Sequence, residues 1–339
     1  MSTSDEPNLK RKRGEISPEG TATPVVPTRS DIWYNDGNVV LQAQGVQFRV
    51  HKSILAESSS VFGDMFGFPQ PPSANTELVE GCPVVHVSDS AQEMTYILQA
   101  LCQRKYLGYG EILSIPVLSA FLCLGQKYDI QQLYLNARKR LFENYPDANV
   151  EWTAMEAVES FMEIVIIARK TGLLSILPYV LYSCCHMESA AEIIDGTRRK
   201  DGSISILPIQ DRLACLAGYR AICDAQADTM YAWLHMPLGE IVTAGCKISV
   251  ACKGARGNIF LQDFSPKQRI MGFPVKADYA GLCGICAAVA DRKYQEGREA
   301  MWERLPALFG LPPWAELLKE RAECASYLSL HRNPLINCL

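Results

Sequence analysis

Residues 30–66 read SDIWYNDGNVVLQAQGVQFRVHKSILAESSSVFGDMF and contain the clearest strand and turn signals in the N-terminal part of the chain. On each side of Gly45, apolar residues alternate with glutamine or arginine, which is typical of two β-strands that each bury one face. Gly45 lies where the chain must reverse, because a tight turn between strands needs a positive φ that glycine adopts readily. The pattern therefore predicts a β-hairpin over residues 39–50.

A further strand and several helices are expected after the hairpin. A short apolar segment at residues 83–87 predicts the strand. Ser90 followed three residues later by Glu93 is typical of a helix start, because each side chain accepts a hydrogen bond from the backbone amide of the other residue. Apolar residues at helical spacing continue to residue 141 and predict three helices. Strands followed by helices indicate an α+β fold.

The second part of the chain has a different pattern. From about residue 151 the strand signals fade, and apolar residues repeat at helical spacing. Gly172 is expected to end the first helix of this region, and Pro208 to begin a long helix that reaches about residue 234. Residues 195–203 are rich in glycine and charge and are expected to form a surface loop. A mainly α-helical C-terminal domain is therefore predicted.

Residues 30–145 resemble a BTB/POZ domain, whose opening pattern is an aspartate before a hairpin that ends in histidine, a basic residue, two further residues, leucine and alanine. The segment VVHVSDS at residues 84–90 is similar to the family's third strand entering a helix, and LCLGQKYDIQQL at residues 122–133 is similar to its late helix pair. The C-terminal stretch, which includes REAMWERLPALFGLPPW at residues 298–314, is similar to fungal BTB proteins of mushroom type. The residues that match the opening pattern are Asp31, Phe48, His51, Lys52, Leu55, Ala56, Ser59, Phe62, Met65 and Phe66.

This resemblance implies a BTB/POZ fold, a small mainly antiparallel sheet covered by helices, over residues 30–145. Residues 146–339 would then form the mainly helical C-terminal domain. Residues 1–29 are polar and rich in proline, so they bury too little surface to offset the entropy cost of ordering, and a disordered tail is expected. Dimeric family members exchange an N-terminal helix and strand, which Pro24 and Pro27 oppose here.

The resemblance also nominates interaction residues. Asp31 and Lys52 correspond to opposed charges that line a pocket for partner peptides in dimeric BTB domains of zinc-finger repressors. The alternative is an exposed ion pair worth under about 1 kcal/mol. His51 lies at the predicted corner between strand and helix, where a structural imidazole is expected rather than a general base. Asp31, His51 and Lys52 are therefore the candidate protein-interaction residues.

A cluster of four basic residues lies in the N-terminal tail. Such a cluster is typical of segments that nuclear import receptors bind, and it is also common as solvated charge. The net charge of −4 gives the chain no overall attraction to phosphate backbones. No signal peptide is recognisable, and no segment has the roughly 20 apolar residues that a bilayer demands, so an intracellular protein of the nucleus or cytoplasm is expected. The cluster consists of Lys10, Arg11, Lys12 and Arg13.

The thirteen cysteines include a CxxC pair, Cys283 and Cys286, and a wider pair, Cys246 and Cys252, which thirty residues separate from it. Four thiolates are the ligand set of a closed tetrahedral zinc site. One structural zinc ion would stabilise the glycine- and proline-rich segment 239–281, which has no obvious core. The alternative is that the four cysteines are small hydrophobic residues and that the protein has no cofactor.

The sequence contains none of the common motifs for phosphate, dinucleotide or zinc-protease chemistry, nor a nucleophile elbow. We therefore expect a non-enzymatic protein with no small-molecule substrate, no membrane and no direct nucleic-acid partner. Its BTB domain would be a binding or oligomerisation module for other proteins, among them a second copy of the chain or a cullin-type scaffold. Two narrower hypotheses stay open: a substrate adaptor of a cullin-type ubiquitin ligase, and a nuclear transcription-regulatory cofactor.

Overall fold

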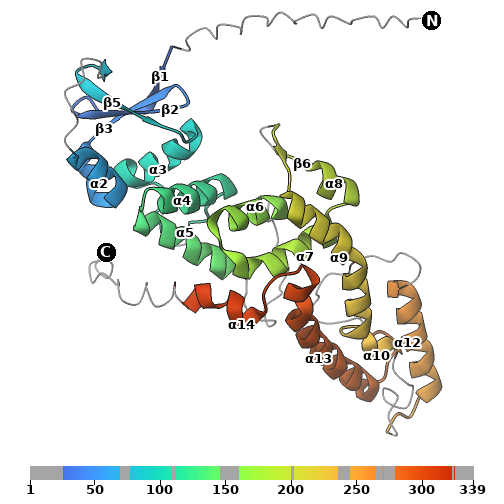
Figure 1. Cartoon of the computed structure of the whole chain (residues 1–339). Helices are drawn as coiled ribbons and strands as arrows, with labels where there is room; N and C mark the ends of the chain where they lie inside the picture. Colours follow the sequence, from blue (N-terminus) through green and yellow to red (C-terminus); the bar gives the residue numbers. More distant parts are fainter. Residues whose placement is uncertain are drawn as a thin grey trace, which may run out of the picture.

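A five-stranded sheet forms one end of the molecule (Figure 1). The structure is a computed structural model, and it describes residues 26–68, 77–108, 111–145, 160–199, 202–235, 245–264, 270, 279–322 and 324. The strand order is β1-β3-β2-β5-β4. The β2–β3 and β4–β5 pairs are antiparallel, whereas β1 runs parallel to β3 and β5 runs parallel to β2, so the sheet is mixed. The strands span Thr28–Trp33 (β1), Val39–Ala43 (β2), Val46–Val50 (β3), Leu78–Val79 (β4) and Cys82–Val87 (β5).

The hairpin predicted around Gly45 is present as β2 and β3. Gln44 and Gly45 both have positive φ, 45° and 79°, which suits a tight turn whose twist matches the strands on either side. The sheet is larger than the three strands expected from the sequence, because β1 and β4 each add an edge. Glu80 and Gly81, with φ of 50° and 78°, make a second turn of the same kind between β4 and β5.

The helices of this part lie together below the sheet in the view of Figure 1. The side chains of Phe48, Leu55, Phe62 and Ile97 are fully buried between sheet and helices. Burying each of these stabilises the fold by about 2 kcal/mol relative to exposing it. The helices span Lys52–Ser58 (α1), Ser60–Gly67 (α2), Ala91–Gln103 (α3), Ile115–Lys127 (α4) and Gln131–Asn144 (α5).

Polar contacts hold the corner between α2 and the end of α4. Ser59 caps α2 by accepting a hydrogen bond from the amide of Phe62 at 3.0 Å, and its hydroxyl donates to the backbone oxygen of Tyr128. The ring of Tyr128 stacks on Phe62 at 4.7 Å between centroids, and its hydroxyl donates to Asp89. Burial and the Asp89 carboxylate raise the pKa of Tyr128, so this hydroxyl stays protonated.

The C-terminal region is mainly helical and continues the same hydrophobic core. Helix α6 packs against α4, and Gly172 ends α6 with a φ of 75°, as predicted. None of the described helices is both long enough and apolar enough to cross a membrane. The helices span Phe161–Thr171 (α6), Leu174–Ile176 (η2), Leu177–Met187 (α7), Ala190–Asp195 (α8), Ile209–Asp228 (α9), Ala232–His235 (α10), Ser249–Phe264 (α12), Gly284–Leu308 (α13) and Trp314–Leu317 (α14).

Two features of this region differ from the sequence-based expectation. The predicted loop after α8 contains a small hairpin, Thr197–Arg198 (β6) with Ile204–Ser205 (β7). The long helix that Pro208 begins is interrupted at Thr229. At this point α13 approaches so closely that a Cβ on Gly297 would lie 2.4 Å from the backbone oxygen of Thr229. The break is therefore part of the packing between α9, α10 and α13.

Candidate functional site

Strand β1 forms one edge of the described sheet and carries a bulge. Its register with β3 shifts between Arg29 and Trp33. Within the bulge, Ser30 Oγ accepts a hydrogen bond from the amide of Ile32 at 3.1 Å. Ile32 is buried in the core, whereas Asp31 is exposed. Bulges at sheet edges commonly re-aim a side chain next to a functional site, and here the bulge carries an acidic one.

An open pocket of about 420 Å³ lies between this bulged strand and the C-terminal half of α3. Asp31 lines it on the strand side, and the amide side chains of Gln99 and Gln103 line it on the helix side. The hydroxyl of Tyr106 donates to Gln99 Oε1 at 2.8 Å, which holds that side chain in place. Lys105 at the end of α3 brings a positive charge to the same pocket. The residues that line the pocket therefore offer positive and negative charge, together with hydrogen-bond donors and acceptors.

Asp31 and Lys52 lie on different elements, Asp31 in β1 and Lys52 at the start of α1. Among the described residues, no hydrogen bond or ion pair joins them, and Lys52 does not line the pocket that Asp31 lines. Lys52 begins α1, where its amide donates to Asn38 Oδ1 at 2.8 Å and its ammonium lies 5.8 Å from the centre of the Phe66 ring. Arg29 and Lys105 bring positive charges to the lining of this pocket.

His51 lies directly before α1, at the corner where the resemblance placed it. Its Nε2 lies 3.2 Å from Asp36 Oδ2, and its ring lies 5.5 Å from that of Tyr34. The hydrogen bond from His51 lowers the pKa of Asp36 below its usual value. These contacts connect the start of α1 to the loop before β2.

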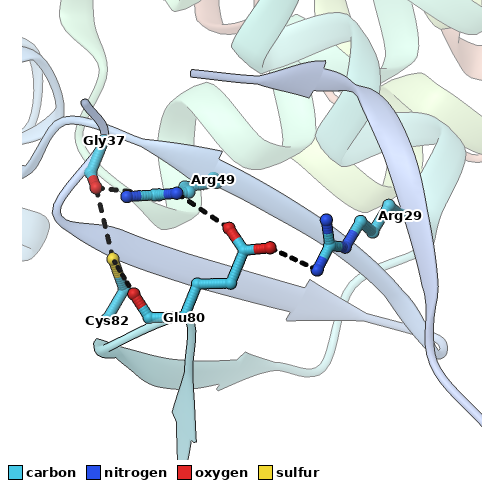
Figure 2. A network of polar contacts seen from close by, with 5 residues as sticks. All are labelled: Arg29, Gly37, Arg49, Glu80 and Cys82. Carbon is cyan, nitrogen blue, oxygen red and sulfur yellow. Dashed lines mark hydrogen bonds and ion pairs between the residues drawn. The ribbon is translucent and has the colours of Figure 1, made fainter. Parts of the chain in front are cut away.

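A charge network joins β1, β3 and the β4–β5 turn (Figure 2). One carboxylate oxygen of Glu80 accepts a hydrogen bond from Arg29, and the other accepts from Arg49 at 2.9 Å. Arg49 also donates from Nε to the backbone oxygen of Gly37 at 2.9 Å, and the thiol of Cys82 donates to that oxygen at 3.2 Å. Glu80 therefore links the edge strand β1 and its neighbour β3 to the β4–β5 turn.

None of the residues in this network was predicted from the sequence as a site residue. A signal was present: Glu80-Gly81 is an acidic residue followed by glycine between short apolar segments, which resembles the Asp-Gly dipeptide of hairpin turns. The partners of Glu80 had no local signal, since Arg29 and Arg49 lie 51 and 31 residues away.

The four cysteines nominated as metal ligands come together in the structure. Their Sγ atoms all lie within 4.8 Å of one another, with Cys252 and Cys286 buried and Cys246 and Cys283 half-buried. The pKa of Cys283 falls to about 7, first because the backbone amide of Cys286 donates to its sulfur, and further because the neighbouring thiols hydrogen-bond to it. The four cysteines predicted from their spacing therefore form one cluster in the fold.

The N-terminal basic cluster and the fungal resemblance were not tested by the structure. Lys10, Arg11, Lys12 and Arg13 lie outside the described residues, so nuclear import stays a prediction. The resemblance of the C-terminal stretch to mushroom-type proteins stays a prediction as well.

Comparison with known proteins identifies the N-terminal part of the chain. Residues 35–141 match the sequence model of the BTB/POZ domain family, a range that begins just after β1 and ends within α5. No curated protein and no solved structure matches the chain. The matched range carries the mixed sheet, apart from its edge strand β1, together with the helices that cover it. This chain therefore contains a BTB/POZ domain, a protein–protein interaction module.

Proposed function

We propose that this chain is a non-catalytic interaction protein in which the BTB/POZ domain binds another protein and the helical C-terminal region extends from that domain. The observation that carries the proposal is the match of residues 35–141 to the BTB/POZ family, together with a sheet and helices over the same residues. Domains of this family bind other proteins through a surface of the domain.

The pocket between β1 and α3 is the surface that we propose for partner binding. An edge strand offers backbone amides and carbonyls to an extended peptide, which gives affinity without regard to sequence. The side chains of Gln99 and Gln103 supply further donors and acceptors, while Asp31 and Lys105 present opposite charges. A peptide that carries complementary charges would be oriented by these two residues.

Site-specific photo-crosslinking in the full chain tests this placement. A photoreactive amino acid at Gln103 is expected to crosslink a partner protein in the cells that naturally express the chain, and Asp31→Lys is expected to abolish that crosslink. The same photoreactive residue at Arg220, which is 92% exposed and distant in sequence, is the matched control. A protein captured equally at both positions, or at neither, would contradict the pocket as the binding site.

A second candidate is a substrate adaptor for a cullin-type ubiquitin ligase. The packing of α6 against α4 favours it, because the helical region then continues directly from the BTB/POZ domain, as in adaptors in which helices follow this domain. Isothermal titration of the full chain with a purified cullin N-terminal region is expected to give saturable binding. An absence of binding would exclude the adaptor role and leave the wider interaction role intact.

A further use of a BTB/POZ domain is self-association, which light scattering after size-exclusion chromatography measures directly. In this chain β1 pairs with β3 of its own sheet, and Arg29 and Glu80 hold it there. We therefore expect a mass of one chain. If the wild-type chain forms a dimer, and Glu80→Ala increases the fraction of dimer, β1 exchanges between chains instead.

A further inference from the structure

The cysteine cluster lies at the end of the molecule farthest from the sheet, where α12 and α13 begin (Figure 1). Cys246 precedes α12, and Cys252 lies in its first turns. Cys283 is the N-cap of α13, and Cys286 lies in its first turn. The cluster therefore joins the starts of two helices that are remote in the sequence.

The distances between the sulfurs fit four ligands around one centre. Cys246 Sγ lies 3.7 Å from Cys252 Sγ and 3.7 Å from Cys283 Sγ. Zinc–thiolate bonds of about 2.3 Å in a tetrahedron place neighbouring sulfurs about 3.8 Å apart. A disulfide would need about 2.05 Å between two of them. The cluster thus has the dimensions of a tetrahedral four-sulfur site.

A backbone amide and two helix N-termini surround the cluster. The amide of Cys283 donates to Cys252 Sγ at 3.3 Å. The N-terminal ends of α12 and α13 both face the cluster, and a helix N-terminus carries partial positive charge. Four thiolates in one place repel one another, so such a site needs these amides together with a cation at its centre.

Helix α12 buries few of its described side chains. Among its described side chains, Cys252, Arg256 and Ile259 are buried. Arg256 donates to the backbone oxygen of Leu234 at 2.9 Å, which ties α12 to α10. On the other side, Gly281, with a φ of 81°, passes so close that a Cβ there would lie 2.8 Å from the Cβ of Ala255. The chain therefore brings the CxxC segment directly against α12.

We propose that Cys246, Cys252, Cys283 and Cys286 bind one structural zinc ion that fastens the start of α12 to the start of α13. All four ligands come from the protein, which is typical of a closed structural site rather than a catalytic one with an open position. Zinc binding supplies folding free energy to a segment that has little apolar core. The ion would fix the shape of the end of the molecule opposite the BTB/POZ domain.

Elemental analysis of the purified full chain, prepared without chelators and with its thiols reduced, is the first test. We expect about one zinc ion per chain, and a fall to background in the double variant Cys283→Ser with Cys286→Ser. The matched control is Cys102→Ser with Cys223→Ser, two half-buried cysteines outside the cluster, which is expected to keep the zinc. Unchanged zinc in the first variant, or iron in the wild-type protein, would overturn the proposal.

A second measurement on the wild-type chain does not depend on whether the variants fold. Cobalt(II) exchanged into the site is expected to give the visible and near-ultraviolet bands of tetrahedral four-sulfur coordination. A chelator is expected to remove the metal and make the four thiols accessible to alkylation, which peptide mass spectrometry locates. Octahedral cobalt bands, or Cys246–Cys252 and Cys283–Cys286 recovered as disulfides from freshly purified protein, would refute a zinc site.

Discussion

Arg321 donates a hydrogen bond from Nη2 to the backbone oxygen of Tyr145 at 2.7 Å, so the chain beyond α14 holds the end of α5. The same guanidinium donates to the backbone oxygen of Phe142 at 3.3 Å and to Ser175 Oγ at 3.0 Å. It also lies 4.6 Å over the Phe142 ring. One side chain near the C-terminus thus joins the last helix of the BTB/POZ domain to η2 in the helical region.

Replacing Arg321 with alanine removes these three hydrogen bonds at once. Bonds from a charged donor contribute about 1.5–3 kcal/mol each, and bonds from one group are not additive, so we expect the free energy of unfolding to fall by about 3 kcal/mol. Urea unfolding followed by circular dichroism measures this. Arg220→Ala, at a side chain that is 92% exposed, is expected to change it by under about 0.5 kcal/mol. Equal effects of the two substitutions would contradict the role of Arg321.

Gly297→Ala is expected to destabilise the protein although alanine favours helices. A Cβ at this position would lie 2.4 Å from the backbone oxygen of Thr229 and 2.8 Å from the Cα of Met230, and backbone cannot move aside as a side chain does. We expect a loss of about 2 kcal/mol. Gly257→Ala in α12 meets no atom within 4 Å and is expected to stabilise by up to about 1 kcal/mol. Thermal unfolding of both variants should shift in opposite directions.

Glu80→Ala is expected to loosen β1 locally, while the backbone pairing of β1 with β3 is kept. Exposed ion pairs contribute about 0–1 kcal/mol, and the Glu80 side chain is 39% exposed, so the global stability should change little. Locally, Arg29 and Arg49 lose their shared partner. Hydrogen–deuterium exchange should therefore accelerate in β1 and stay unchanged in β2 and β5. Unchanged exchange in β1, or Glu143→Ala producing the same acceleration, would show that Glu80 does not hold the strand.

The contact between His51 and Asp36 predicts a pH-dependent contribution to stability. The pKa of Asp36 is lowered in the folded state, first by the hydrogen bond from His51. The folded pKa thus lies below the unfolded value of about 3.9, so the carboxylate stabilises the fold above that pH, and this contribution disappears as the pH falls through the folded pKa. The stability difference between wild type and Asp36→Asn should therefore shrink below about pH 4.

Nuclear magnetic resonance titration measures the Asp36 pKa directly. His51→Gln removes the imidazole and is expected to return this pKa toward about 3.9. A pKa of Asp36 that is the same in wild type and His51→Gln would show that the histidine does not cause the shift.

Local sequence patterns determined much of the fold. Gly45 marked the β2–β3 turn, Ser90 marked the start of α3, and Gly172 marked the end of α6, because each of these features depends on the conformation of a few neighbouring residues. The spacing of the cysteines likewise pointed to Cys283 and Cys286 with Cys246 and Cys252. Side-chain periodicity and turn chemistry are local, so the sequence shows them directly.

Tertiary structure alone decided the features that depend on distant contacts. The bulge in β1, the pairing of Glu80 with Arg29 and Arg49, and the interruption at Thr229 opposite Gly297 have no local signal. The same holds for the pocket that Asp31 and residues of α3 line together. These features arise when segments tens of residues apart pack together, and close packing selects one geometry among many that the local sequence allows.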